Sequence, residues 1–275
     1  MSIEITEAVR EADARLRRAS DSGIPCAPVR DLIGAEDQDA AYAVQSLDIA
    51  RRLEAGRVVV GRKIGLTSPA VQAQFGVFTP DYGVLLDDMV FADREPLPLG
   101  AFLQPRVEAE VAFVLGRDLD SPAANVADVI RATEFVLPAI EVVDSRIAGW
   151  DIRIADTIAD NASSGALVLG TVPRTLHGLD LPNAGMRLDA AGEPVSVGSG
   201  AACLGSPVIA MAWLARAVAR HGNPLRAGEV VLSGALGPMV GARAGVFHAR
   251  IDGLGEVRAV FDAPETTSNG KDAAA

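Results

Sequence analysis

The chain has 275 residues, of which 49% are hydrophobic and 22% are charged, an ordinary composition for a globular protein that can bury a sizeable core. Its 36 Asp and Glu residues outnumber 25 Lys and Arg residues, so the formal net charge is −11. This acidity argues against sequence-independent binding of nucleic acid, because such binding needs a basic surface.

Cysteine usage and hydropathy indicate the compartment. Cys26 and Cys203 are far apart and lie in no CxxC pattern, so neither a disulfide framework nor a zinc knuckle is expected. The N-terminal residues are charged where a signal peptide needs an apolar core. The longest uncharged run, residues 194–215, is broken by Gly, Ser and Pro and does not resemble a membrane span. We therefore expect a soluble, cytoplasmic protein with no membrane partner.

Helical spacing of apolar residues dominates the start of the chain. It predicts one helix over residues 4–20, ended by Ser22 and Gly23, and a second over residues 37–55, ended by Gly56. From Val58 onward, short β-branched runs alternate with turn residues, interrupted by predicted helices at 126–135 and 207–220. The polar tail from Pro264 is expected to be disordered. The pattern predicts an α+β protein with a helical N-terminal region (1–57), a β-rich domain (58–263) and a tail (264–275).

Common catalytic motifs do not explain the chain. It contains no HExxH, no GxSxG and no EF-hand loop, and residues 56–63 imitate a phosphate-binding loop without its GK[ST] ending. The three histidines, His177, His221 and His248, are scattered in sequence, which argues against a histidine metal site or a Ser-His-Asp triad.

Carboxylates give a more specific pattern. Glu108 and Glu110 are two residues apart in a predicted strand, so they share one face and would repel each other without a cation between them. The oxygen donors favour a hard divalent ion such as Mg²⁺ or Mn²⁺, although an ExE pair alone is also typical of a solvated strand face. Glu141 lies alone in an apolar run and needs a partner, either the same cation or a nearby arginine such as Arg106 or Arg146.

Other polar residues allow more than one interpretation. Lys63 follows an apolar strand and lies between glycines, so it is either a partly desolvated group for proton transfer or anion binding, or a surface lysine at a strand end. Asp81 alone would be a turn residue. The loop at 160–165 offers hydroxyl and backbone N–H groups, although most loops of this composition are plain turns.

Four stretches, in this order, resemble the 2-hydroxypenta-2,4-dienoate (2-keto-4-pentenoate) hydratases of the fumarylacetoacetate hydrolase superfamily: residues 61–85, 104–119, 136–165 and 232–245. The likeness extends over most of residues 5–262. It implies a helical N-terminal region beside a mixed, mostly antiparallel β-roll domain. It also implies a homo-oligomer with a small dienoate substrate and an association with neighbouring pathway enzymes. The residues it implicates are Glu108, Glu110 and Glu141 as ligands of Mg²⁺ or Mn²⁺, Lys63 and Asp81 as catalytic groups, and Asp160, Asn161, Ser163 and Ser164 as a substrate-side loop.

The reaction implied by the resemblance is addition of water to 2-hydroxypenta-2,4-dienoate in meta-cleavage catabolism of aromatic compounds. Two related reactions remain open: decarboxylation of 4-oxalocrotonate, and hydration of a longer 2-oxo-ene-dioate. Both need a site that accommodates a second carboxylate at the far end of the substrate. A non-catalytic partner subunit is a further alternative, but the intact acidic residues and Lys63 argue against it.

Overall fold

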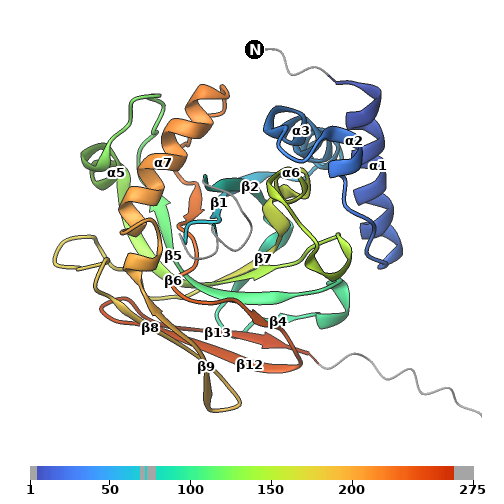
Figure 1. Ribbon diagram of the computed structural model, residues 1–275. Helices are drawn as coiled ribbons and strands as arrows, with labels where there is room; N and C mark the ends of the chain where they lie inside the picture. Colours follow the sequence, from blue (N-terminus) through green and yellow to red (C-terminus); the bar gives the residue numbers. More distant parts are fainter. Residues whose placement is uncertain (1–4, 69–71, 73–78, 263–275) are drawn as a thin grey trace, which may run out of the picture.

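The computed structural model describes residues 5–68, 72 and 79–262, and these form two β-sheets with helices on either side (Figure 1). The helices are α1 (Glu7–Ser22), α2 (Arg30–Ile33), α3 (Gln38–Glu54), α5 (Val126–Ala132), α6 (Ile154–Ala159) and α7 (Pro207–Arg220). The strands are β1 (Val59–Gly65), β2 (Asp81–Leu86), β3 (Val90–Ala92), β4 (Pro96–Leu97), β5 (Arg106–Leu115), β6 (Thr133–Val143), β7 (Ser164–Leu169), β8 (Gly185–Ala190), β9 (Glu193–Ser199), β10 (Val230–Leu232), β11 (Val240–Gly241), β12 (Gly245–Ile251) and β13 (Gly255–Phe261).

The larger sheet has eight strands, and the smaller has five. In the larger sheet the order is β2-β1-β10-β5-β6-β7-β3, and β11 also pairs with β5. The smaller sheet has the order β4-β13-β12-β8-β9. Most pairs are antiparallel, but β1–β10, β3–β7 and β4–β13 are parallel. The expected combination of helices with mixed sheets is confirmed.

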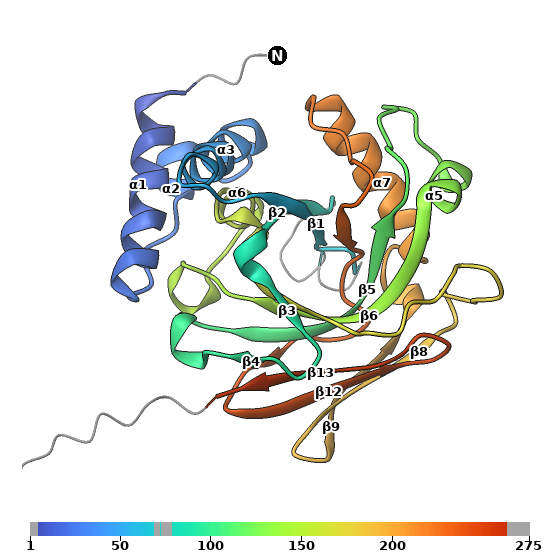
Figure 2. The same cartoon turned by 180° about the vertical axis from the view of Figure 1, so that it is seen from behind.

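The main hydrophobic core lies between the two sheets (Figures 1 and 2). Phe113 and Ile140 point into it from β5 and β6, and Phe247 and Phe261 point into it from β12 and β13. Because side chains alternate along a strand, Glu108 and Glu110 must face the opposite side of the larger sheet. Burying each large apolar side chain contributes about 1.5–3 kcal/mol, so this core anchors the strands that carry the acids.

Helices α1, α2, α3 and α6 group together on one side of the molecule, with α5 and α7 on the other (Figures 1 and 2). Helices α1, α2, α3 and α6 share an apolar cluster that includes Val44 of α3 and Ile158 of α6. The buried carboxylate of Asp156 ties α6 to α2, because its Oδ1 accepts hydrogen bonds from the backbone N–H groups of Val29 and Arg30, both at 2.9 Å. The N-terminal helices are therefore packed against a segment that comes from the middle of the chain.

Helix boundaries follow capping chemistry. Thr6 accepts a hydrogen bond from the backbone N–H of Val9, so α1 begins at Glu7 and not at residue 4. The helix predicted over 126–135 ends at Ala132, because the β-branched and aromatic residues that follow begin strand β6. Two short helices, α2 and α6, are absent from the sequence prediction. The tail at 264–275 lies outside the described residues.

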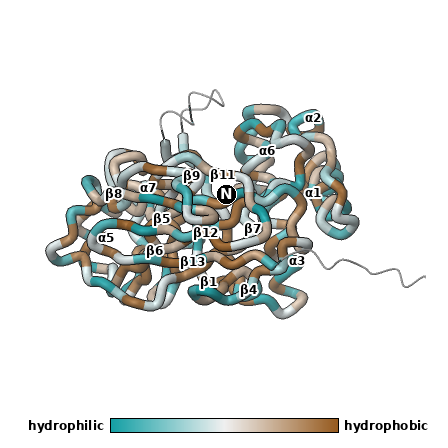
Figure 3. The backbone as a smooth tube through the Cα atoms, turned by 90° about the horizontal axis from the view of Figure 1, so that it is seen from below, coloured by the Kyte–Doolittle hydropathy of each residue, from teal (hydrophilic) through white to brown (hydrophobic). Residues whose placement is uncertain are grey.

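Hydrophobic residues are distributed along the strands of both sheets and not gathered into one segment (Figure 3). By length and composition, Gly200–Arg220 could cross a membrane, but half of its most apolar window is buried inside the protein. A core helix of a globular protein has the same property, and α7 contributes Met211 and Leu214 to the main core.

Candidate active site

Strand register brings three glutamates together on one face of the larger sheet. Glu108 of β5 is the direct antiparallel partner of Glu141 of β6, and Glu110 lies two residues further along the same face. Carboxylate oxygens from the three residues lie within 4.8 Å of one another. Glu110 is 0% exposed and Glu141 is 1% exposed, so the cluster is not a solvated strand face.

Several oxygens of this cluster lack hydrogen-bond donors. Glu110 Oε2 accepts a hydrogen bond from the backbone N–H of Gly234 at 2.7 Å. Among the described residues, Glu110 Oε1 and both carboxylate oxygens of Glu141 have no hydrogen-bond partner. The nearest cation is Lys63, whose Nζ lies 3.1 Å from Glu141 Oε1, close enough for an ion pair but at an angle outside hydrogen-bond geometry.

The sequence allowed a nearby arginine as the partner of Glu141, and the structure shows that this interpretation is wrong. Arg146 pairs with Asp160, and the Arg106 guanidinium lies 4.5 Å from the centre of the Trp150 ring. The partner of Glu141 is therefore Lys63, which comes from β1, a strand separated from β6 by β10 and β5 in the sheet order.

Burial and mutual repulsion resist simultaneous ionisation of the glutamates. Burial raises the pKa of Glu108 to about 7, with a further contribution from Glu141. Burial also raises the pKa of Glu110 well above its ordinary value, aided by Glu141 and Glu108. Buried carboxylates with unpaired oxygens, and oxygen as the only donor type, fit a hard divalent cation such as Mg²⁺ or Mn²⁺.

Lys63 and Asp81 reach the same face from β1 and β2. In their antiparallel register Lys63 lies opposite Gly83, and Asp81 lies opposite Gly65. The glycines leave room for the functional side chains: a Cβ atom on Gly65 would lie 2.1 Å from Asp81 Oδ1. β1 runs parallel to β10, which pairs with β5, and this strand order brings Lys63 to the glutamates.

The environments of Lys63 and Asp81 differ from those of surface residues. Burial by itself would lower the pKa of Lys63, but the neighbouring carboxylates, Glu141 foremost, raise it overall. Burial raises the pKa of Asp81, and the charge of Lys63 opposes that rise. Asp81 Oδ2 accepts a hydrogen bond from Thr157 Oγ1 of α6 at 3.0 Å, while Asp81 Oδ1 has no partner within the described part of the chain. Both groups are thus buried ionisable side chains beside the glutamates.

The loop predicted on the substrate side forms a left-handed turn. Asn161, Ala162 and Ser163 all have positive φ angles, at 53°, 50° and 54°, a costly conformation for residues with side chains. The Asn161 side chain holds the turn against β2: its Oδ1 accepts from the Val84 N–H at 2.8 Å and its Nδ2 donates to the Val84 carbonyl at 2.9 Å. Gly83 is required beside it, because a Cβ atom there would lie 2.5 Å from the Asn161 carbonyl oxygen.

Other members of the loop also contribute to its shape. Asp160 accepts hydrogen bonds from the side chain and backbone of Arg146, and Ser164 Oγ donates to the Asn161 carbonyl at 2.7 Å. Despite the ion pair, burial raises the pKa of Asp160 to about 6. Ser163 Oγ is buried and has no partner among the described residues, so it is the hydroxyl of this loop with free hydrogen-bonding capacity.

Sequence reasoning missed three contributors to this region, Thr157, Gly83 and Gly234, and it noted Gly65 only as a neighbour of Lys63. Glycine inside a strand is a recognised signal of close backbone or ligand approach, and Gly65 and Gly83 carried that signal. Thr157 and Gly234 come close only through tertiary folding, so no local pattern indicates them.

Comparison with known proteins agrees with this geometry. Residues 62–262 match the model of the fumarylacetoacetate (FAA) hydrolase C-terminal family. The chain belongs to this family. Among curated relatives, "TodF product hydratase" of Pseudomonas putida is 59% identical over 93% of this chain and 96% of its own length. A 2-keto-4-pentenoate hydratase of Paraburkholderia xenovorans is 55% identical over 92% of this chain and 94% of its own length.

A solved FAA-hydrolase-type structure is also similar. The 4-oxalocrotonate decarboxylase of Pseudomonas putida G7, complexed with magnesium and adipate, has a TM-score of 0.89 and 33% sequence identity. The match covers 94% of this chain and 99% of the decarboxylase. The resemblance to 2-keto-4-pentenoate hydratases inferred from sequence motifs is confirmed.

Proposed function

We propose that this protein is a divalent-metal-dependent hydro-lyase that adds water to 2-hydroxypenta-2,4-dienoate to give 4-hydroxy-2-oxopentanoate, within meta-cleavage catabolism of aromatic compounds. The observation that carries the proposal is the buried convergence of three glutamates and Lys63 in a chain 53–59% identical to several hydratases. A non-catalytic subunit would have no use for such a costly cluster.

Glu108, Glu110 and Glu141 would hold the metal ion, Mg²⁺ or Mn²⁺, through their carboxylate oxygens. Solved relatives with magnesium, calcium and manganese support a divalent ion. When bound, such an ion supplies Lewis-acid chemistry to the carboxylate and 2-oxygen end of the substrate. The Gly234 N–H would keep Glu110 oriented, because it already holds one of its oxygens.

Lys63 and Asp81 would move the protons. The terminal alkene becomes electrophilic when the dienol ketonises, which requires loss of a proton from the 2-hydroxyl and gain of one at C5. Water then adds at C4, and C3 receives a proton, so the product contains one more water molecule than the substrate. Lys63 and Asp81 share the buried face beside the glutamates, and each such group typically contributes about 10²–10⁴-fold in rate. The Ser163 hydroxyl, with Asp160, Asn161 and Ser164 shaping its loop, would contact the substrate.

The test is an ultraviolet assay of dienol consumption with Mg²⁺ or Mn²⁺, with identification of the product. We expect 4-hydroxy-2-oxopentanoate to form only with added metal. Glu141→Gln should lose turnover and metal binding while remaining folded. Failure to consume the dienol with either metal would rule out the proposed reaction.

Decarboxylation of 4-oxalocrotonate is the second candidate, and Arg106 is the observation that favours it. Arg106 lies two residues before Glu108 on the same face of β5 and would supply a cation for a second substrate carboxylate. The same feature would suit hydration of a longer 2-oxo-ene-dioate. A CO₂-release assay on 4-oxalocrotonate, run beside the dienol assay, separates these reactions. The higher identity to hydratases favours hydration of the shorter substrate.

The same proposal covers the organisation of the protein. We infer a helical N-terminal region at 1–57, a β-roll catalytic domain at 58–263 and a separate tail at 264–275. The first boundary is supported by the start of β1 at Val59, and Lys63, Asp81 and the glutamates all follow it. A soluble, cytoplasmic homo-oligomer associated with neighbouring pathway enzymes completes the proposal, and light scattering of the purified protein tests the oligomer.

A further inference from the structure

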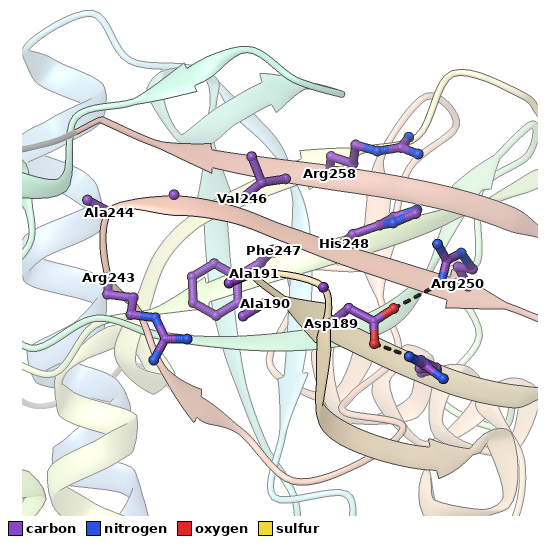
Figure 4. A pocket seen from close by; sticks show the side chains of 13 residues that line it. Asp189, Ala190, Ala191, Arg243, Ala244, Val246, Phe247, His248, Arg250 and Arg258 are labelled. Carbon is purple, nitrogen blue, oxygen red and sulfur yellow. Dashed lines mark hydrogen bonds and ion pairs between the residues drawn. The ribbon is translucent and has the colours of Figure 1, made fainter.

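A second concave region lies on the outer face of the five-stranded sheet. It has a volume of about 510 Å³ and is bordered by β8, β12, β13 and the turn between β8 and β9. The hydrophobic core separates it from the glutamates, because the inward side chains of β8 and β12, such as Leu188 and Ala249, pack toward the larger sheet. The cationic and titratable nitrogen groups lining it are Arg187, Arg243, Arg250, Arg258 and His248, of which Figure 4 labels all except Arg187.

A buried carboxylate organises one end of this pocket. Arg187 of β8 and Arg250 of β12 are direct register partners, an arrangement that places like charges opposite each other. Asp189 joins them: its Oδ1 accepts from Arg187 Nε at 2.6 Å and its Oδ2 accepts from Arg250 Nη1 at 2.9 Å. The Asp189 side chain is only 7% exposed, whereas the two arginine side chains are 50% and 52% exposed. Their remaining N–H donors make no hydrogen bond within the described residues and stay available to a ligand.

Cations exceed carboxylates around the pocket. Glu256 of β13 lies beside these groups and forms ion pairs with His248 at 2.9 Å, Arg258 at 2.8 Å and Arg250 at 3.8 Å. Arg243 forms no hydrogen bond or ion pair with any part of the chain that the structure describes. Four arginines and one carboxylate, Asp189, line the pocket itself, which leaves a local positive excess on a protein whose net charge is −11.

Two of the arginines lie at opposite ends of the pocket. In Figure 4, Arg243 lies at one end of the pocket and Arg250 at the other, with Ala190, Ala191 and Phe247 between them. A single small anion would engage one end only. An elongated molecule with an anionic group at each end would engage both and cover the small apolar floor.

We propose that this pocket binds a small molecule with two separated anionic groups, either carboxylates or phosphates. Arginine suits both, because its planar guanidinium donates paired hydrogen bonds to either group. Asp189 is the residue that positions Arg187 and Arg250 for this task. The site is separate from the proposed catalytic centre, so its occupancy and the hydration reaction can be tested independently.

The experiment is isothermal titration calorimetry of the metal-loaded protein with three probes: adipate, fructose 1,6-bisphosphate and inorganic phosphate. We expect at least one of the two-ended probes to bind more tightly than inorganic phosphate. Binding of adipate alone, weakened by the arginine variants, identifies a dicarboxylate site, and binding of the bisphosphate alone, weakened in the same way, identifies a phosphate site. Arg243→Ala and Arg250→Ala should each weaken that binding about tenfold or more.

Arg226→Ala is the matched control, because Arg226 is 56% exposed and pairs with Asp118 away from this pocket. It should leave probe affinity unchanged. Arg243→Ala should keep the turnover of the dienol substrate, so a failure of the anion site would not affect the proposed reaction. Three results would overturn the anion site: no binding of either two-ended probe at millimolar concentration, wild-type probe affinity in both arginine variants, or a changed oligomer mass in the variants with unchanged probe binding.

Discussion

Replacement of Lys63 by arginine distinguishes a proton-transferring lysine from one that only neutralises the glutamates. The amine of Lys63 can lose its proton when its surroundings change, whereas a guanidinium keeps its proton near neutral pH. If Lys63 transfers protons, Lys63→Arg should lower kcat about 10²-fold or more, equivalent to about 2.7 kcal/mol in the barrier. If it only supplies charge, arginine should keep most of the rate.

The larger size of arginine is the main competing explanation for a lower rate of Lys63→Arg. A second variant separates the effect of size from the loss of proton transfer. The Lys63 side chain is 3% exposed, so the larger arginine must displace its neighbours. Lys63→Ala avoids this problem because it creates space where the buried side chain was, opposite Gly83, and we expect small primary amines to enter that space. We expect added amines to restore part of the turnover of Lys63→Ala, while equally sized guanidinium salts do not.

Metal binding is measured in parallel, by calorimetry on each variant. Loss of Lys63 should leave metal affinity intact or increased, because the three glutamates no longer share their charge with an ammonium group. Near wild-type turnover of Lys63→Arg would refute the proton-transfer role and assign it to Asp81. Rescue of Lys63→Ala by guanidinium as well as by amines would lead to the same conclusion.

Three further predictions follow from the geometry. Chelation of divalent metal should abolish turnover reversibly, and Glu110→Gln should weaken metal binding about tenfold or more by calorimetry, whereas full activity after chelation would contradict the metal site. Gly65→Ala should reduce kcat about tenfold or more, because the new Cβ would displace the Asp81 carboxylate. Gly100→Ala is the control, because a Cβ there meets nothing within 4 Å. Equal kinetics for the two variants would disprove the role of the space beside Gly65. A double Cys26→Ser and Cys203→Ser variant should keep its turnover, since burial raises the pKa of the Cys203 thiol to about 12, and a folded but inactive variant would contradict this.

Local patterns were sufficient to indicate the acids. The period of two residues in a strand placed Glu108 and Glu110 on one face, and the apolar neighbours of Glu141 showed that it needed a partner. These inferences depend only on residues within one strand. The likeness to known hydratases then implied catalytic roles for Lys63 and Asp81, which spacing alone left open.

Patterns within one strand could not predict that Lys63 is the partner of Glu141. Lys63 reaches it because β1 pairs in parallel with β10, and β10 pairs with β5, a strand order that joins segments about 170 positions apart in sequence. Helix α6 was missed for a related reason: it has six residues, all of them buried, and so lacks the amphipathic pattern that marks a surface helix. Thr157, which holds Asp81, lies on this helix.

The charge balance of the site explains why such a cluster can persist in a folded protein. Glu110, Glu141 and Asp81 are each at most 1% exposed, Glu108 is partly buried, and Lys63 is the ammonium group beside them. Replacing a buried charged cluster with apolar residues usually leaves a protein as stable or makes it more stable, so stability alone does not favour this arrangement. The apolar core on the opposite face of the sheet offsets the cost, and because it also fixes the register of β5 and β6, it keeps Glu108 and Glu141 opposed whether or not a cation is bound. A cluster that the fold holds together in this way can accept a cation without rearranging, and the pKa values of Glu108 and Glu110 are raised first by burial and then by repulsion between the carboxylates.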